Sequence, residues 1–420
     1  MTLLARRPVS QALSPYETMF IALARAYVEK YPKASFVFRF DRAAREEVGT
    51  APHAAEVAFT NSAAIWKEIL TRGSCALGEA YCKGHIHGAR EDVTKFLELM
   101  LRVSEEPDLR RYLSVRDKLQ VALAVARSKG SLSSSRSTDV NAHYSLDRVL
   151  TDPDLSNEFF FAWLGREYPV YSCAYWGRGA KTLVQGQLDK FEHYVERLAL
   201  APGQSLLDLG CGWGTQGIYY AQRHGINVTL LTLSRAQAHH IRRRIDAENL
   251  ADRVKLLEMD MMEIDRLDER YDRIISLGAI EHIADFDTLF HKSAERLKPG
   301  GKALFHTMFN ETHHEFDAWN ARYMWPGVQI PSRERLLGNL ALHFQHVDFE
   351  VFAPRSYSRT FEIWAENFFE REAELLKILC RGEVAEPEWL LRAFKYYLMC
   401  CSVVYNVYMD VGNAVCWNDA

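Results

Sequence analysis

The chain has 420 residues, of which 48% are hydrophobic and 25% are charged. This composition is typical of a globular protein, and the length exceeds one typical domain core, so two domains are expected. The formal net charge of -4 gives no general attraction to phosphates, which argues against a nucleic acid partner. Any contact with an anionic membrane must then come from a local patch.

The sequence contains eight cysteines, but they form no CxxC pair and show no zinc-ligand spacing. We therefore expect neither a disulfide framework nor a metal site, and a reducing cytoplasm fits best. No segment approaches the roughly 18 consecutive apolar residues of a membrane-spanning helix. The first residues, up to Arg7, are not followed by the apolar segment of a signal peptide. We predict a soluble, cytoplasmic protein.

The first part of the chain predicts a small α+β domain. Hydrophobic residues alternate over 36–40, as in a short strand, whereas 63–70 and 93–103 have the apolar spacing of helices. The segment KGSLSSSRSTD, within 128–140, is rich in serine and poor in hydrophobic residues, which is typical of a flexible linker. We predict an N-terminal domain over 1–127, a linker over 128–140 and a catalytic domain over 141–420.

The second part predicts a doubly wound α/β sheet. Apolar, strand-like runs occur at 205–209, 227–232, 254–258, 273–277 and 302–305. They alternate with segments of helical spacing, such as 235–248, which indicates a largely parallel sheet. Ligands of such sheets bind beyond the carboxyl ends of the strands, so the residues after each run are site candidates. The aromatic-rich stretch 388–417 also has helical spacing, and is interpreted as a core-packing helix or as one wall of an apolar substrate channel.

A glycine-rich loop, Asp208-Leu-Gly210-Cys-Gly212-Trp-Gly214, follows the first run and leads into a helix beginning at about Thr215. Its glycines permit a tight turn and a close approach of the backbone to a ligand. The spacing is GxGxG, whereas the dinucleotide fingerprint is GxGxxG, so a pyrophosphate site is disfavoured. The loop resembles that of the class I S-adenosylmethionine methyltransferases, which have a Rossmann-like sheet. The resemblance implies S-adenosylmethionine as the cofactor.

Polar residues follow the second and third runs of the predicted sheet. Thr232, Ser234 and Gln237 offer hydroxyl and amide groups that can bond a ribose diol. Ser234 is equally a good N-cap for the next helix, and both roles could hold at once. Asp260 could accept a hydrogen bond from the adenine amino group or could be an ordinary turn residue, and Met261 could lie against the adenine ring.

Four further motifs carry a more specific resemblance. They are Tyr171-Ser-Cys-Ala-Tyr-Trp176, Glu281-His282 after the fourth run, His306-Thr307 after the fifth, and Tyr357-Ser-Arg-Thr360 followed by Trp364. Their order and placement together resemble the cyclopropane-fatty-acid synthase family over about 35–397. The resemblance implies that Tyr171 and Ser172 contact the cofactor and that the N-terminal domain is of a lipid-binding type.

The resemblance also implies a bound bicarbonate ion that acts as the general base. The positions that match its ligands are Cys173 through its backbone N–H, Glu281, His306, the backbone N–H of Met308, and Tyr357. The implied reaction adds a methylene unit from S-adenosylmethionine to the cis double bond of an unsaturated phospholipid acyl chain and closes a cyclopropane ring. The implied partners are these acyl chains, reached by transient peripheral contact with the inner face of the membrane, and a second copy of the chain in a homodimer.

Chemistry of this kind needs a dry site. Methyl transfer to an alkene gives a carbocation, which water would trap. Aromatic ring faces stabilise positive charge by roughly 0.5–2 kcal/mol each when they are desolvated. The candidates are Tyr175, Trp176, Phe309, Tyr323 and Trp325, although simple packing is the more common role of such residues.

Three alternatives to cyclopropane formation remain open at this point. The same site can stop after methyl transfer and proton loss, which leaves a methylene-bearing or methyl-branched chain. Small-molecule N-methyltransferases share the cofactor core and a Glu-His pair. A lipid-binding module without catalysis is the third alternative, and it would neither bind nor consume S-adenosylmethionine.

Overall fold

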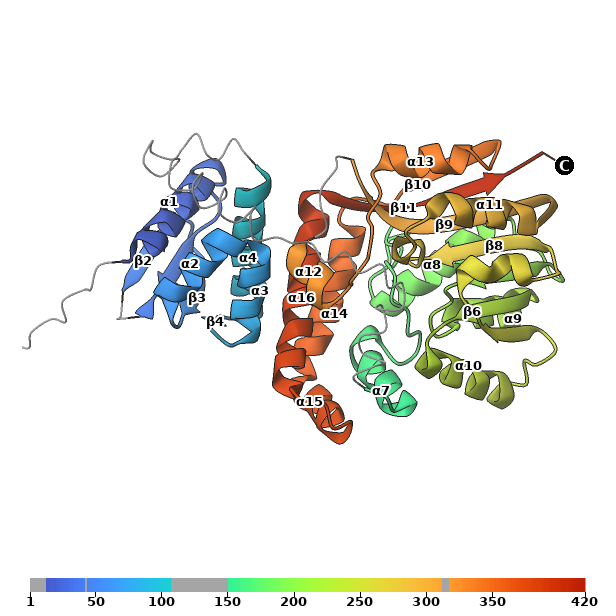
Figure 1. Ribbon diagram of the computed structural model, residues 1–420, viewed down its shortest axis with the longest axis horizontal. Helices are drawn as coiled ribbons and strands as arrows, with labels where there is room; N and C mark the ends of the chain where they lie inside the picture. The colour runs from blue at the N-terminus through green and yellow to red at the C-terminus, as the bar shows by residue number, and fades with distance from the viewer. Residues whose placement is uncertain (1–12, 42–43, 107–149, 312–316, 420) are drawn as a thin grey trace, which may run out of the picture. The chain divides into compact units, whose positions relative to one another are not determined.

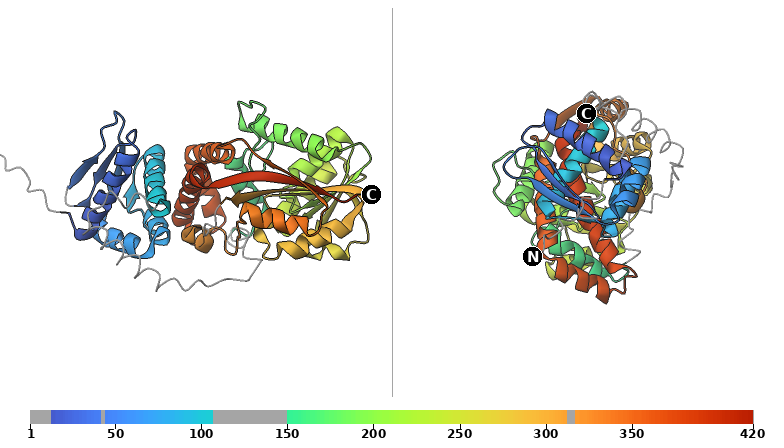
Figure 2. Two further views of the ribbon diagram at one scale, coloured as in Figure 1. Left: turned by 90° about the horizontal axis from the view of Figure 1, so that it is seen from above. Right: turned by 90° about the vertical axis from the view of Figure 1, so that its left-hand side faces the viewer.

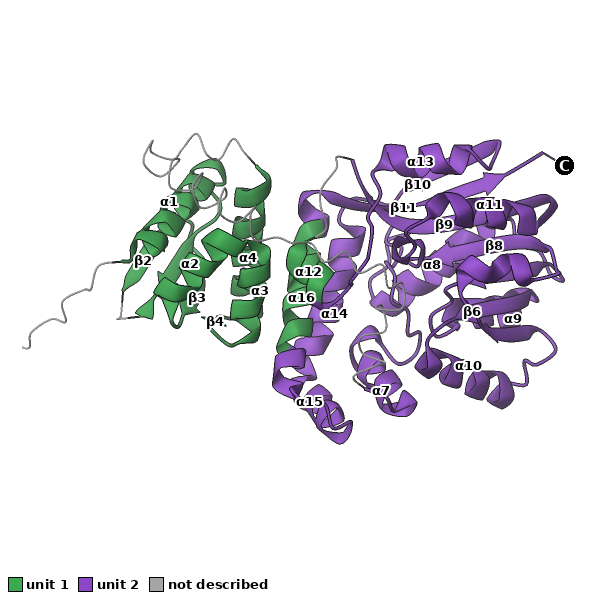
Figure 3. Ribbon diagram, in the orientation of Figure 1, with its two compact units in different colours: residues 1–135, 317–322, 392–404 green, residues 136–316, 323–391, 405–420 purple. Residues whose placement is uncertain are grey.

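The computed structural model describes residues 13–41, 44–106, 150–311 and 317–419 (Figure 1). They fall into two units (Figure 3). The first takes in the described residues before position 107 together with Asp317–Arg322 and Arg392–Val404, and the second takes in the rest. The predicted linker over 128–140, where the two predicted domains meet, lies outside the described residues.

The first unit contains a mixed sheet and its helices. Its strands are β1 (Phe36–Arg39), β2 (Arg45–Val48), β3 (Ala55–Phe59) and β4 (Ile86–His87), and its main helices are α1 (Pro15–Lys30), α2 (Ser62–Arg72), α3 (Ser74–Cys82) and α4 (Arg90–Glu105). The strand order is β2-β1-β3-β4, with β3 parallel to β1 and the other pairs antiparallel. The strand predicted over 36–40 and the helices predicted over 63–70 and 93–103 are confirmed as β1, α2 and α4.

Aromatic side chains fill the core of the first unit. Phe20 of α1 stacks on Trp66 of α2 with 3.8 Å between ring centroids, and all of this pair is buried. Two later helices contribute to the same unit, namely α12 (Ala318–Tyr323) and the middle of α16 (Pro387–Val407). Trp319 of α12 contacts Tyr396 of α16 edge to face at 4.6 Å. The first unit is therefore built from segments that are distant in the sequence.

The second unit contains a seven-stranded sheet with the order β10-β11-β9-β8-β5-β6-β7. Its strands are β5 (Ser205–Leu209), β6 (Asn227–Thr232), β7 (Val254–Glu258), β8 (Tyr271–Leu277), β9 (Leu297–Asn310), β10 (His346–Val351) and β11 (Met409–Trp417). The first five are mutually parallel, whereas β11 runs antiparallel between β9 and β10. All five predicted strands and the doubly wound, largely parallel sheet are confirmed.

The second unit also contains helices, several of which cover the two faces of this sheet. They are α7 (Pro153–Leu164), α8 (Leu183–Leu198), α9 (Thr215–His224), α10 (Arg235–Ala247), α11 (Phe286–Arg296), α13 (Arg333–Ala341), α14 (Ser356–Glu370) and α15 (Glu372–Arg381), with the short helices η4 (Met261–Arg266) and η5 (Ile280–His282). Figure 2 (left) shows the green helices α8 and α9 on one face, with the yellow and orange helices α11 and α13 on the other. Leu207 and Leu209 of β5 point to the latter face, where they join a buried cluster with Phe290 and Leu336. Because successive side chains of a strand point to opposite faces, Asp208, which lies between these two leucines, points to the face that α9 covers.

The chain beyond position 408 differs from the prediction of a helix over 388–417. Helix α16 ends at Val407, and Met409–Trp417 forms β11, so the prediction is wrong for the last residues. The reason is tertiary, because β11 fills the gap between β9 and β10 and pairs along its length with β9. Among the described residues, no helix is both long enough and apolar enough to cross a bilayer.

Candidate active site

The glycine-rich loop joins the end of β5 to the start of α9. Gly210, Gly212 and Gly214 have φ angles of 75°, 58° and 68°, a region that favours glycine. A Cβ atom on Gly210 would lie 2.6 Å from the Cβ of Ala279 and 3.1 Å from the Cε of Met261. The loop therefore passes directly against the segment after β8, and Met261 lies beside it, while a contact of Met261 with adenine stays a prediction.

Asp208 lies in β5, just before this loop. Its side chain is buried, and burial raises the pKa of the carboxyl group to about 7. A buried carboxylate needs a cationic or hydrogen-bonding partner to remain ionised. This is the electrostatic setting in which a positively charged ligand group at the adjacent loop would be stabilised.

The residues after β6 form a small hydrogen-bonded cluster. The hydroxyl of Thr232 lies 2.7 Å from Oε1 of Gln237 and accepts a hydrogen bond from the backbone N–H of Ser234. The Ser234 hydroxyl accepts from the backbone N–H of Gln237 at 3.2 Å, which confirms its N-cap role. After β7, Asp260 accepts from the N–H of Met262 at 2.9 Å, which is its turn role. Ligand contacts of these four residues stay predictions.

Helix α7 packs over the glycine-rich loop. Asn157 accepts a hydrogen bond from the indole N–H of Trp213 at 2.8 Å and donates one to the carbonyl of Ala236 at 2.9 Å. Phe160 and Phe161 contact the ring of Trp213 at 5.3 and 5.5 Å. The phenylalanine-rich helix thus joins the loop after β5 to the start of α10, and covers the predicted cofactor site with apolar rings.

Ser172 is held by two residues of α8 that the sequence analysis did not single out. Lys190 donates to the Ser172 hydroxyl at 2.8 Å, and Gln187 donates to the Ser172 carbonyl at 3.1 Å. Lys190 is completely buried, and this burial lowers the pKa of its amine to about 7. The sequence gives one partial signal, because Lys190 falls on the same helical face as the buried residues Phe191 and Tyr194, but it does not show that this face reaches Ser172. A lysine at such a position is seldom there for packing alone.

Cys173 is fully buried beside this lysine. Its thiol donates to the carbonyl of Ala174 at 3.2 Å, and burial raises the pKa of the thiol to about 12. The sulfur is therefore a thiol and not a nucleophilic thiolate. The next backbone N–H, that of Ala174, donates to the hydroxyl of Thr360 at 3.2 Å. This bond ties the Cys173 segment to α14, the helix that also carries Tyr357.

Glu281 in η5 has one satisfied and one unsatisfied oxygen. Its Oε1 accepts from the hydroxyl of Thr307 at 2.7 Å and from the backbone N–H of Met308 at 2.9 Å. Its Oε2 is buried and has no hydrogen-bond partner within the described residues. Desolvation raises the pKa of this carboxyl group. A buried carboxylate oxygen without a partner is costly, so it marks a place where a ligand donor would be stabilised.

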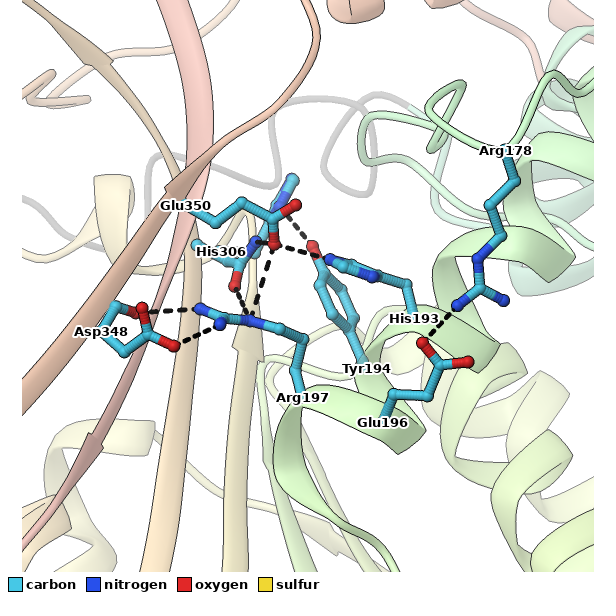
Figure 4. Close-up of polar contacts among 9 residues, drawn as sticks. Arg178, His193, Tyr194, Glu196, Arg197, His306, Asp348 and Glu350 are labelled. Atoms are coloured by element: carbon cyan, nitrogen blue, oxygen red, sulfur yellow. Dashed lines mark hydrogen bonds and ion pairs between the residues drawn. The ribbon is translucent and has the colours of Figure 1, made fainter.

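The sequence predicted that His306 follows the fifth strand. In the structure, His306 lies within that strand, β9. Pairing with β8 stops at His306, while pairing with β11 extends β9 to Asn310. The ring is buried, and its Nδ1 lies 2.7 Å from the hydroxyl of Tyr194 on α8 (Figure 4). Burial, with a contribution from the charge of Lys190, lowers the pKa of His306 well below its usual value. The imidazole is therefore neutral at physiological pH.

Tyr357 is linked to Met308 through the ring of Tyr405. Its ring lies 4.4 Å from that of Tyr405, whose hydroxyl contacts the sulfur of Met308. Trp364, two turns of α14 further on, packs 5.5 Å from the ring of Tyr171. The helix α14 thus contacts both the residues predicted to hold bicarbonate and a residue predicted to contact the cofactor.

The short segment after β8 connects the two predicted sites. The N–H of Gly278 donates to the carbonyl of His306 at 2.9 Å, and a Cβ on Gly278 would lie 3.6 Å from the Cβ of Ser172. Ala279, the next residue, lies against Gly210. The glycine-rich loop, the Ser172 segment and β9 therefore each lie against Gly278 or Ala279, at the carboxyl end of β8.

The five aromatic candidates have different surroundings. Trp325 packs against Tyr171 at 5.7 Å, beside the predicted cofactor site. Each of the others packs on a different partner: Tyr175 on His193, Trp176 under Arg359, Phe309 on Phe349 and Tyr323 on Trp389. Trp325 also contacts the ring of His282, the residue after Glu281, at 5.5 Å. Within the described ranges, no group of three His, Cys, Asp or Glu side chains has the arrangement of a metal site.

The donor and acceptor groups fit the two expected ligands. The strained glycine turn, the hydroxyl and amide groups after β6 and the buried carboxyl of Asp208 suit a nucleoside with a cationic end. The free oxygen of Glu281 suits the hydroxyl of a hydrogencarbonate ion, while a ring N–H of His306 suits its anionic oxygens. The sequence analysis named Thr307, which bonds to Glu281, only as part of the His306-Thr307 motif, and it did not identify Tyr194, which bonds to His306.

Comparison with known proteins agrees with this architecture. Residues 135–413 match the family model described as mycolic acid cyclopropane synthetase. The cyclopropane-fatty-acyl-phospholipid synthase of Escherichia coli (strain K12) is 31% identical over 348 residues, which are 81% of this chain and 82% of that protein. The cyclopropane synthase MmaA2 from Mycobacterium tuberculosis has a TM-score of 0.57 at 28% identity, over 64% of this chain and 96% of that one.

A second similar structure was solved with bound ligands. The mycolic acid cyclopropane synthase CmaA1, complexed with SAH and CTAB, has a TM-score of 0.55 at 26% identity and covers 64% of this chain and 96% of its own. The matched family model spans most of the second unit, including the glycine-rich loop and the residues from Tyr171 to Tyr357. The chain belongs to the mycolic acid cyclopropane synthetase family and is an S-adenosylmethionine-dependent methyltransferase.

Proposed function

We propose that this methyltransferase converts the cis double bond of an unsaturated phospholipid acyl chain into a cyclopropane ring, with bound bicarbonate as the general base. The observation that carries the proposal is the buried Oε2 of Glu281, which has no hydrogen-bond partner among the described residues, while Oε1 is bonded to Thr307 and Met308, the residues that follow the neutral His306. The name of the Escherichia coli relative supports the lipid class of the substrate.

Each group at the site has a defined task in this proposal. When bound, S-adenosylmethionine supplies an electrophilic methyl group and bicarbonate supplies a base. The Gly210–Gly214 loop and Ser172 orient the cofactor so that its methyl group faces the alkene, which removes much of the entropic cost of the reaction. Glu281 would accept a hydrogen bond from the hydroxyl of the anion, and His306 would donate an N–H to one of its other oxygens. Together they aim a basic oxygen at the new methyl group.

Exclusion of water is the task of the surrounding apolar residues. Phe160, Phe161 and Trp213 close over the cofactor loop, and Tyr171, Trp325 and Trp364 pack together nearby. Such surroundings would keep water away from the carbocation that methyl transfer forms. Cys173 does not compete, because its buried thiol remains protonated.

Expression in a host with unsaturated phospholipids tests the proposed reaction. The expected product is a fatty acid that is heavier by one CH2, without its alkene signal and with ring protons in the empty upfield region of the proton spectrum. An exomethylene or a methyl-branch signal in place of the ring protons would overturn the cyclopropane assignment. A product mass gain on a small amine and not on lipid would favour N-methylation instead.

Access to acyl chains leads to a second part of the proposal. We propose that the protein reaches its substrate from the cytoplasmic side by peripheral contact with the membrane surface, since phospholipid acyl chains reside in bilayers. Flotation with vesicles of unsaturated phospholipid should carry the protein to the lipid layer, and failure to float would contradict the proposal. The homodimer stays a prediction, which sedimentation equilibrium measures directly.

A further inference from the structure

Tyr194 and His306 form an isolated pair between α8 and β9. The Tyr194 hydroxyl lies 2.7 Å from Nδ1 of His306, and both side chains are buried (Figure 4). Within the described residues, the hydroxyl of Tyr194 has no other hydrogen-bond partner, and Nε2 of His306 has none. The proton between the two residues therefore decides which ring nitrogen of His306 carries hydrogen.

The positions of the protons follow from the surroundings. Burial raises the pKa of Tyr194 well above its usual value and lowers that of His306 well below, so the phenol keeps its proton and the imidazole has only one. If Nδ1 held the ring proton, the phenol O–H would be buried without an acceptor. The lower-energy arrangement has Tyr194 donating to Nδ1, which leaves the ring proton on Nε2.

A second set of contacts fixes the position of Tyr194. The neighbouring residues of α8 reach β10, where His193 contacts Glu350 at 2.6 Å and Arg197 bonds to Asp348 (Figure 4). Asn413, the β11 residue paired with His306, bonds to the same Glu350 at 3.2 Å. These contacts hold α8 in one register against the strands, so the Tyr194 hydroxyl stays in line with Nδ1.

We propose that Tyr194 is a positioning residue that keeps His306 in the Nε2–H tautomer, so that the imidazole donates a hydrogen bond to the bound anion. The inference rests on the proposed function, because it takes bicarbonate as the acceptor. A ring with its proton on Nδ1 would instead present the lone pair of Nε2 to the anion, and the contact would be repulsive.

The tautomer is measured directly by nuclear magnetic resonance on the full chain with 15N-labelled histidine. Two-bond correlations distinguish protonated from unprotonated ring nitrogens, and the His306 signals are identified by their loss in His306→Gln. The expected result is Nε2–H in the unaltered protein and a mixture with Nδ1–H in Tyr194→Phe. Observation of Nδ1–H in the unaltered protein would overturn the inference.

Kinetics with varied bicarbonate provide the functional readout. We expect Tyr194→Phe to raise the half-saturating bicarbonate concentration by about tenfold, on the scale of a lost charge-assisted hydrogen bond, and to keep kcat within about twofold at saturation. The matched control is Tyr220→Phe on α9, because Tyr220 is equally buried but its hydroxyl bonds to Phe191 and Gln216. The control should lose stability without a change in either bicarbonate parameter.

The two possible failures are distinguishable. If Tyr194→Phe leaves both the tautomer and the bicarbonate dependence unchanged, the inference is wrong and the proposed function stands. If the unaltered protein turns over equally well without bicarbonate, the proposed base is wrong, and with it the anion that Tyr194 was inferred to serve.

Discussion

The Oε1 atom of Glu281 lies 2.9 Å from the backbone nitrogen of Met308, a bond that joins the segment after β8 to the carboxyl end of β9. It fixes the carboxyl group in one orientation, with the hydroxyl of Thr307 as a second donor. The other oxygen, Oε2, is left buried and without a partner among the described residues. The geometry of Glu281 therefore sets a single acceptor position toward the proposed anion.

Replacement of this carboxyl group should separate catalysis from folding. We expect Glu281→Gln to cut turnover by about 10² or more, the usual scale for loss of general-base support, with binding of S-adenosylhomocysteine retained. Tyr357→Phe should do the same. The Tm of Glu281→Gln should not fall, because the neutral amide avoids the desolvation that raises the pKa of Glu281.

Glu263→Gln is the matched control for this variant, since Glu263 is exposed in an ion pair with Arg266 and should have little effect on turnover. Near-normal turnover of Glu281→Gln at limiting bicarbonate would show that the base site is assigned to the wrong residues.

The glycine-rich loop offers a test of cofactor binding. In Gly210→Ala, the new Cβ would lie 2.6 Å from the Cβ of Ala279, at a φ angle of 75°. We expect a loss of about 1–3 kcal/mol in the free energy of unfolding and at least tenfold weaker binding of S-adenosylhomocysteine, measured by calorimetry. Gly338→Ala in α13 has no atom within 4 Å of the added Cβ and should be neutral or stabilising by about 1 kcal/mol. Equal affinities in the two variants would contradict the placement of the cofactor at this loop.

Cys173 should tolerate a change of its side chain. The proposed contact with bicarbonate uses its backbone N–H, and the thiol, with a pKa raised to about 12, is no nucleophile. We expect Cys173→Ser to keep turnover within about fivefold, since a serine hydroxyl can donate to the Ala174 carbonyl as the thiol does. Cys416→Ser, at a buried site in β11, controls for placing a hydroxyl in the core. Complete inactivation of a folded Cys173→Ser protein would rule out a backbone-only role.

Much of the fold could be predicted because its signals are local. The five parallel strands are short, mainly apolar runs. Four of them are largely buried, whereas β7 at the edge of the sheet is partly exposed, and the glycine spacing marks the first turn of the sheet. Strands β10 and β11 gave no such signal. The residues of β10 are half exposed, and those of β11 continue the apolar character of α16 without a proline or glycine at the boundary. Their assignment depends on pairing between distant segments, which a single sequence does not reveal.

In the candidate site too, some residues could be predicted from local sequence signals and others depend on contacts between distant segments. Residues just after a strand, such as Ser234 and Glu281, could be named from their position in the predicted sheet. Lys190 and Tyr194 could not, because they act from a helix that precedes the glycine-rich loop, and only the packing of α8 against β9 brings them to Ser172 and His306.

Lys190 should make stability depend on pH. Its pKa is lowered by burial from 10.5 to about 7, so between these values the unfolded chain binds a proton that the folded protein lacks. The free energy of unfolding should therefore rise with pH in this window, by at most about 1.4 kcal/mol per pH unit, and the full cost of burying the charge should be present below it. Lys190→Met should show a flatter dependence in urea titrations at about pH 7.5, 8.5 and 9.5. Parallel curves for the two proteins would contradict a depressed pKa at Lys190.

The most direct test of the proposed chemistry is the rate of cyclopropane formation by the purified protein as bicarbonate is added back to a carbonate-free buffer. The substrates would be vesicles of unsaturated phospholipid and S-adenosylmethionine with a 13C-labelled methyl group. The labelled ring carbon of the product would then be detected by nuclear magnetic resonance. We predict a low rate without bicarbonate and a saturable increase on titration, which Glu281→Gln abolishes. A rate that is the same at every bicarbonate concentration would contradict the assignment of Glu281, His306 and Met308 as an anion site.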